Sequence, residues 1–163
     1  MRASVLAAVA LASSSALADV SIAQFPLAEH PAGDYERAAR EFETGDKAEA
    51  TCLFYRGQYR FRVHLAARPD LPPSGDPALM ASLNDVLGRT INEWAGGDPD
   101  VWVDAMECAL DWVQANDDPF TPKAKFASAH EASADGLAGL VETVRSSKEE
   151  IRAERAARGL ENR

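Results

Sequence analysis

Three basic side chains recur every four residues in the middle of the chain, at Arg56, Arg60 and His64. In an α-helix this interval places them on one face, and we refer to them as the basic stripe. Arginine binds carboxylate and phosphate groups through two parallel hydrogen bonds. The basic stripe, with Tyr59 beside it, is therefore a candidate site for an anionic ligand.

The basic stripe also has a purely structural interpretation. Asp104, Glu107 and Asp111 follow helical spacing as well, and would share one face of a second helix. If the two helices are held together, these carboxylates neutralise the basic stripe from within the fold. The sequence leaves both interpretations open, a set of internal ion pairs or a ligand site.

The N-terminal residues have the pattern of a secretory leader. Arg2 gives a positive start, residues 5–11 form a short apolar stretch, and Ala16-Leu17-Ala18 has the small-x-small pattern of a cleavage site. We predict a signal peptide over residues 1–18 and an exported mature chain, with the periplasm as the expected compartment. The apolar stretch is too short to span a bilayer, so we expect no membrane anchor.

The chain holds two cysteines, Cys52 and Cys108. An even number of cysteines in an exported chain predicts a disulfide. This disulfide would tie the segment with the basic stripe to the segment with the acidic residues. A redox-active pair would normally have the spacing Cys-x-x-Cys, which the sequence lacks.

The other residues that could bind a metal or act in catalysis do not occur in any recognisable motif. His30, His64 and His130 are not at metal-ligand spacing from one another, and no P-loop, Gly-x-Ser-x-Gly or His-Glu-x-x-His motif occurs. We therefore expect no metal, no cofactor and no catalytic residue. Trp102 lies opposite part of the apolar stripe formed by Val103, Met106 and Leu110, and an exposed tryptophan there would anchor a partner.

Composition limits the partners. The 163 residues include 17 lysines and arginines against 26 aspartates and glutamates, a formal net charge of −9. A surface of this charge repels nucleic acid and attracts a basic protein. The length, with 46% hydrophobic residues, is that of a single domain over residues 19–163.

Helix signals divide the mature chain. Gly-Asp pairs at 33–34, 45–46, 75–76 and 97–98 indicate a helix end followed by an N-cap. Apolar periodicity then predicts helices over 35–43, 47–67, 77–94 and 99–115, followed by a C-terminal helical part that Gly136 and Gly139 break near Ser133. The last dozen residues are charged and are expected to fray.

One segment has small and aromatic residues in a familiar order: Gly45, Ala50, Phe54 and Gly57. Residues 34–68 thereby resemble one tetratricopeptide or Sel1-like repeat, although Arg37 and Ala38 stand where the repeat has a Leu-Gly-like pair. The resemblance implies a helical hairpin and a binding role. The rest of the chain is similar to uncharacterised exported bacterial proteins, which implies no chemistry.

Together these patterns predict an all-α domain of five or six helices with one disulfide, built as an up-down bundle or an array of helical hairpins. The expected function is that of a non-catalytic, exported binding or protein-interaction module. Two alternatives stay open. One is an immunity or inhibitor protein that neutralises a basic partner, and the other is a cell-envelope enzyme that uses residues of the segments 47–67 and 99–115.

Overall fold

A computed structural model describes residues 29–163, and this part of the chain is all-α, as predicted. The predicted signal peptide over residues 1–18 lies outside the described residues. None of the helices within 29–163 is both long and apolar enough to cross a membrane. The elements in chain order are α1 (Ala32–Thr44), α2 (Lys47–Ala67), α3 (Asp76–Leu83), the π-helix η2 (Asn84–Gly88), α4 (Arg89–Ala95), α5 (Pro99–Ala115), α6 (Lys123–Ser146) and α7 (Lys148–Ala157).

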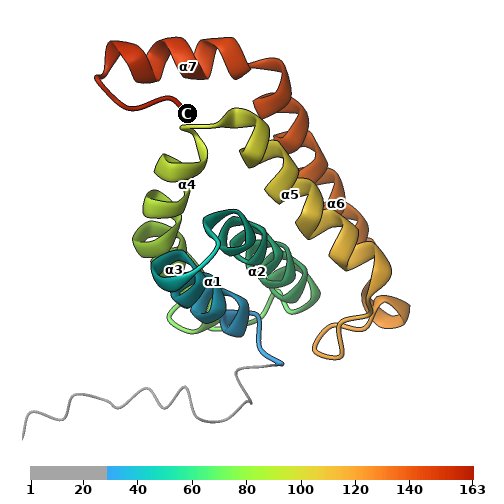
Figure 1. Cartoon of the computed structure of the whole chain (residues 1–163). Coiled ribbons are helices and arrows are strands. Elements are labelled where there is room, and N and C mark those ends of the chain that lie inside the picture. Colours follow the sequence, from blue (N-terminus) through green and yellow to red (C-terminus); the bar gives the residue numbers. More distant parts are fainter. Residues whose placement is uncertain (1–28) are drawn as a thin grey trace, which may run out of the picture.

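Helix α2 lies at the centre of the fold (Figure 1). Helix α1 and the rod formed by α3, η2 and α4 lie on one side of it, and α5 and α6 lie on the other. Helix α7 crosses beyond the ends of α4 and α5. Because α2 is covered on nearly every side, its side chains Leu53, Phe54 and Phe61 are fully buried and form the middle of the core.

The helices that carry the two predicted sets of charged residues begin at their predicted caps. The carboxylate of Asp46 accepts hydrogen bonds from two amide groups in the first turn of α2, at 2.8 and 3.2 Å. Asp98 caps α5 in the same way, at 3.1 and 3.3 Å. Helix α1 differs, because it begins at Ala32 rather than at residue 35. Asp34 therefore lies inside the first turn of α1 and does not cap it.

A disulfide joins Cys52 of α2 to Cys108 of α5, as predicted. Four residues further along each helix, the Arg56 guanidinium lies 4.4 Å from the centre of the Trp112 ring. Equal steps along both helices show that α2 and α5 run parallel. This is the relation expected of alternate helices in an up-down bundle.

Helices α1 and α2 form a tightly packed hairpin. Gly57 lies against Tyr35 of α1, and a Cβ atom at position 57 would stand 2.7 Å from the Tyr35 ring. The same ring meets Phe54 edge-on at a centroid distance of 5.3 Å. Gly57 and Phe54 are two of the positions in the repeat-like pattern, whose assignment to a repeat family stays a prediction.

The segment predicted as one helix over 77–94 is a continuous rod from Asp76 to Ala95, but it contains a widened π turn. At the start of this turn the side-chain oxygen of Asn84 accepts hydrogen bonds from the Tyr35 hydroxyl and the Gln58 amide, both at 2.9 Å. At its end Gly88 lies over Phe54, whose ring would stand 2.8 Å from a Cβ atom there. Contacts with α1 and α2 thus fix the π turn.

The C-terminal part differs from the prediction in two ways. Helix α6 continues through Gly136 and Gly139, because the burial of its apolar face outweighs the roughly 1 kcal/mol that each glycine costs a helix. The end of the chain is also ordered. Arg155 of α7 and Arg163 donate hydrogen bonds to main-chain carbonyl groups at the end of α4, at 2.9 and 2.5 Å, and so hold α7 and the tail against the domain.

Candidate functional site

The basic stripe of α2 is buried and faces α1 and the loop that follows α5. Arg60 is 5% exposed and stands between two carboxylates. It donates from Nε and Nη2 to the two oxygens of Asp118, at 2.8 and 3.1 Å, and from Nη1 to Asp34, at 3.0 Å. Arg56 donates to the other oxygen of Asp34. Two arginines and two aspartates thus neutralise one another inside the fold.

Asp118 connects this network to the loop before α6. Burial alone would raise the pKa of Asp118, but the hydrogen bonds and charge of Arg60 outweigh it and hold the pKa below its ordinary value. The carboxylate also accepts hydrogen bonds from the Phe120 amide, at 3.0 Å, and from the Thr121 hydroxyl, at 3.1 Å. The charged network therefore fixes the loop on α2.

Internal pairing of the basic stripe is what the structure shows, but the predicted partners are wrong. The carboxylates come from Asp34 in α1, from Asp118 in a loop and from Asp76 at the start of α3, not from Asp104, Glu107 or Asp111. The reason is the rotation of α5 about its axis. Its side with the disulfide and Trp112 meets α2, and its three acidic residues project elsewhere.

His64, at the end of the basic stripe, is held between a carboxylate and an arginine. Its Nε2 lies 2.6 Å from Asp76 Oδ2, and its Nδ1 lies 2.6 Å from Arg68 Nη1. Since arginine can only donate, Nδ1 accepts and Nε2 carries the hydrogen that bonds Asp76. His30 Nε2 lies 3.6 Å from the other Asp76 oxygen, and its Nδ1 accepts from the Ala32 amide at 3.1 Å.

His30, His64 and Asp76 are near enough to share a metal ion, because their ligand atoms lie within 4.8 Å of one another. Their hydrogen bonds oppose that use. A metal-binding histidine presents an unprotonated nitrogen to the metal and donates its other N–H outward. Here both imidazoles accept at Nδ1 and present Nε2–H to the carboxylate. The arrangement fits a histidine clamp, formed by these three residues, that ties the starts of α1 and α3 to α2.

The histidine clamp predicts a loss of stability at mildly acidic pH. Burial, together with the charge of Arg68, lowers the pKa of His64, so the unfolded chain binds the proton more readily than the folded one. The stabilisation is complete above about pH 6.5 and is lost as the pH falls below it, by at most about 1.4 kcal/mol per pH unit for one proton.

Urea unfolding of the wild type and of His64→Gln between about pH 8 and 5 checks this prediction. Glutamine keeps an N–H for Asp76 but does not titrate. The difference in unfolding free energy between the two proteins should therefore shrink as the pH falls. Profiles that stay parallel over the whole range would show that His64 is not the titrating group.

Tyr59, the candidate beside the basic stripe, also has an internal partner. Its hydroxyl lies 2.9 Å from His130 Nδ1. Because His130 Nε2 donates to the main-chain carbonyl of Thr121, at 2.6 Å, Nδ1 is an acceptor and Tyr59 is the donor. Burial raises the pKa of Tyr59 to about 12, so its hydroxyl stays a donor well above neutral pH. This bond joins α2 to α6.

Trp102 is half-buried rather than an exposed anchor. Its indole N–H donates to the Tyr55 hydroxyl at 2.7 Å, and that hydroxyl donates to the side chain of Asn92 at 2.9 Å. The chain of two hydrogen bonds links α5, α2 and α4. Each of the five predicted ligand-binding residues thus has a partner within the fold.

Carboxylates gather on the outward side of α5. Four of them follow helical spacing and make up what we call the acidic face: Asp100, Asp104, Glu107 and Asp111. Basic residues of α6 and α7 pair with Asp100 and Glu107. Asp104 and Asp111 are exposed, and no basic residue within 29–163 forms an ion pair with either. Two of the four carboxylates on the acidic face, Asp104 and Asp111, are therefore open to a partner.

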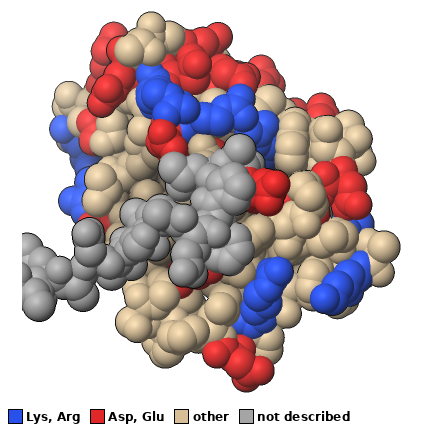
Figure 2. All heavy atoms as spheres, turned by 90° about the horizontal axis from the view of Figure 1, so that it is seen from below, with Lys and Arg blue, Asp and Glu red and all other residues tan. Residues whose placement is uncertain are grey.

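A wider compositional signal accompanies the acidic face, and reasoning from the spacing of single residues missed it. Residues 90–122 contain eight aspartates and glutamates and no lysine, arginine or histidine. Elsewhere the two signs are mixed, as on the side seen from below, where groups of Lys and Arg stand beside Asp and Glu (Figure 2). The excess negative charge is thus concentrated along α5 and its flanking segments.

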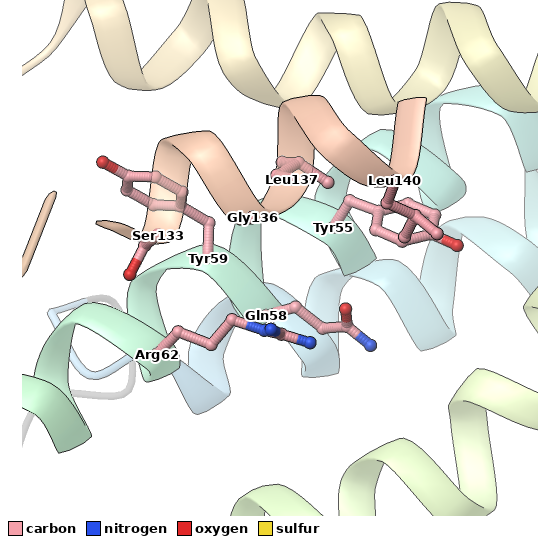
Figure 3. A pocket seen from close by; sticks show the side chains of 8 residues that line it. All are labelled: Tyr55, Gln58, Tyr59, Arg62, Ser133, Gly136, Leu137 and Leu140. Carbon is pink, nitrogen blue, oxygen red and sulfur yellow. The ribbon is translucent and has the colours of Figure 1, made fainter. Parts of the chain in front are cut away.

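A small hollow lies between α2 and α6, on the side of α2 away from the buried ion pairs (Figure 3). Tyr55, Tyr59 and Arg62 of α2 line one wall, and Leu137 and Leu140 of α6 line the other. The cavity volume is about 20 Å³, which is room for about one water molecule. This hollow therefore does not accommodate a substrate.

Comparisons of the chain with protein-family models, with curated proteins and with solved structures found no match.

Proposed function

We propose that the protein is an exported, non-catalytic module that binds another protein through the acidic face of α5. One observation carries this proposal. Arg56 and Arg60 of the basic stripe are engaged in buried ion pairs, whereas Asp104 and Asp111 are exposed and lack a basic partner among the described residues. Unneutralised surface charge of one sign favours a partner of the opposite sign.

The partner that fits this face is a protein with a basic surface. Glu49 of α2 is exposed and lies beside the disulfide, so it extends the negative surface from α5 onto α2. Complementary charge accelerates association and gives it a strong dependence on salt. An immunity or inhibitor protein that neutralises a basic toxin or enzyme is the narrower form of the same proposal.

An enzyme that uses α2 and α5 has less support. The residues that would act in it, Arg56, Arg60 and His64, are all engaged with carboxylates of the fold. The hollow that α2 shares with α6 has room for about one water molecule. A binding surface therefore fits the geometry better than a catalytic centre.

Affinity capture from the exported fraction tests the proposal. The bait proteins are the wild type, the variant Asp104→Asn/Asp111→Asn, and a control, Glu131→Gln/Asp135→Asn, which removes two exposed carboxylates from α6. We expect the wild type and the control to retain a protein with a basic surface, and moderate salt to release it. The α5 variant should retain about tenfold less.

Two results would contradict the proposal. One is capture that is equally strong with the α5 variant and with the control. The other is a captured partner whose binding does not weaken as the salt concentration rises, since an interface built on exposed carboxylates must respond to screening.

A further inference from the structure

A second hollow, much larger than the one beside α6, lies where helices α1, α2, α4 and α7 meet the residues that follow α7. Phe42 of α1, Lys47 at the start of α2, Trp94 at the end of α4 and Arg155 of α7 line it together with the tail that ends in Arg163. Its cavity volume is about 410 Å³, within the roughly 300–1,000 Å³ that is common for small-molecule sites. Figure 1 shows the tail after α7 returning to the end of α4. We call this space the tail hollow.

Two aromatic rings provide the apolar surface of the tail hollow. Phe42 and Trp94 meet edge-on with their centroids 6.1 Å apart, and both side chains are half-buried. Aromatic side chains that line a hollow offer a flat apolar group offset-stacked or edge-on contacts. The rings belong to different helices, so the surface exists only in the folded domain.

Cationic groups stand over both rings. The Arg163 guanidinium lies 4.5 Å from the Trp94 ring centre, and the Lys47 ammonium lies 4.9 Å from that of Phe42. Arg163 uses Nη2 to bond the Trp94 carbonyl. Neither Nε nor Nη1 of Arg163, nor the Lys47 ammonium, has a hydrogen-bond acceptor within residues 29–163. These donors are available to a ligand.

The position of Arg163 is set by the main chain around it. Its amide donates to the Gly97 carbonyl at 2.6 Å. A Cβ atom on Gly97 would stand 2.6 Å from Arg163 Nη1, so the glycine is what lets the guanidinium approach. Arg155 is different, because its guanidinium already bonds the carbonyl groups of Glu93 and Glu161. Arg155 therefore shapes the tail hollow and leaves binding to Lys47 and Arg163.

The charge of the tail hollow favours a single negative group. Three basic side chains line it, and two carboxylates, those of Glu93 and Glu161, oppose them. The side chains alone leave a balance of one positive charge, which suits a monoanion better than a polyanion, because a polyanion would also meet the two carboxylates. This positive balance is local, since the chain as a whole is strongly acidic.

We propose that the tail hollow binds a small aromatic carboxylate. Its ring packs on Trp94 and Phe42, and its carboxylate lies between the Lys47 ammonium and the free donors of Arg163. Charged hydrogen bonds of this kind are stronger than neutral ones, and two donors fix the direction in which the ring enters. The site is independent of the acidic face of α5 and of the function proposed for it.

The test uses three probes of one shape: 2-naphthoate, the neutral 2-naphthamide and the cationic 2-naphthamidine. We expect calorimetry to give a Kd of about 1 mM or below for the naphthoate, as a ligand of this size permits, and at least about tenfold weaker binding for the other two. The naphthoate should also shift the Trp94 indole signal in NMR spectra more than those of Trp102 and Trp112.

Variants locate the site. Lys47→Gln and Arg163→Gln should each weaken naphthoate binding about tenfold. Arg62→Gln serves as the control, because Arg62 is exposed and lies fifteen residues, or about 22 Å, further along α2. Lys47 does not hold the tail, so its variant tests the site even if Arg163→Gln loosens the C-terminal residues.

Three results would overturn the proposal. The first is that the naphthoate does not bind at concentrations up to about 10 mM, which is well above the Kd that the size of the ligand permits. The second is that the naphthamidine binds as tightly as the naphthoate. The third is that Lys47→Gln binds the naphthoate with unchanged affinity.

Discussion

Replacement of Arg60 by methionine is expected to lower the free energy of unfolding by about 3–5 kcal/mol, the usual cost of removing one member of a buried ion pair. Methionine fills much of the same space, but it leaves Asp118 with no positive partner in a site where both side chains are about 5% exposed. Asp34 keeps Arg56, so Asp118 accounts for most of the loss. Equilibrium denaturation in urea measures the effect.

A matched control and the pH dependence make this test specific. Arg62→Met removes an exposed arginine from the same helix and should change stability by about 0.5 kcal/mol or less. The deficit of Arg60→Met should also shrink in acid, because a protonated Asp118 is no longer an unpaired charge. Equal stability of Arg60→Met and the wild type would show that the buried network does not stabilise the fold.

Removal of the disulfide is the second large effect. Cys52 and Cys108 are 56 residues apart in the sequence, and closing a loop of this length stabilises a fold by about 4 kcal/mol in the chain-entropy model. The double variant Cys52→Ser/Cys108→Ser should lose about that amount, a large part of the 5–15 kcal/mol that is typical of a domain. Denaturation with and without a reducing agent gives the comparison. A wild type whose midpoint is unaffected by reduction would contradict the prediction.

The elements that the sequence predicts best are those whose ends are set by neighbouring residues. Helices α2 and α5 begin after Asp46 and Asp98 because a short carboxylate side chain caps the first turn. The disulfide was predictable as well, since two cysteines in a chain that is predicted to be exported leave a single pairing. The helix caps depend on local chemistry, and the disulfide depends on the number of cysteines. Both can be predicted without knowing how the helices pack.

The features that could not be predicted depend on how the helices rotate and pack. The acidic residues of α5 have the right spacing to face α2, but periodicity does not give the rotation of one helix relative to another. The true partner of Arg60 is Asp118, 58 residues away in a loop. The π turn η2 likewise follows from the contacts of Asn84 and Gly88 with other helices.

The candidate binding site in the structure differs from the one predicted from the sequence for the same reason. The basic stripe was the most evident cluster of charged residues in the sequence. Charged side chains can nevertheless be buried when the fold provides carboxylates that pair with them. The acidic face was visible only as three helically spaced residues and as a long stretch without cations. Burial decides between the two clusters, and burial is a property of the packed structure.

Carboxylate footprinting of the complex tests the central proposal most directly. The protein, alone and with its captured partner, is labelled with a carbodiimide and an amine, and the modified residues are mapped by mass spectrometry. We predict that Asp104 and Asp111 are labelled in the free protein and protected in the complex, while Glu131 and Asp135 of α6 are labelled equally in both. Unchanged labelling of Asp104 and Asp111 in the complex would contradict a binding face on α5.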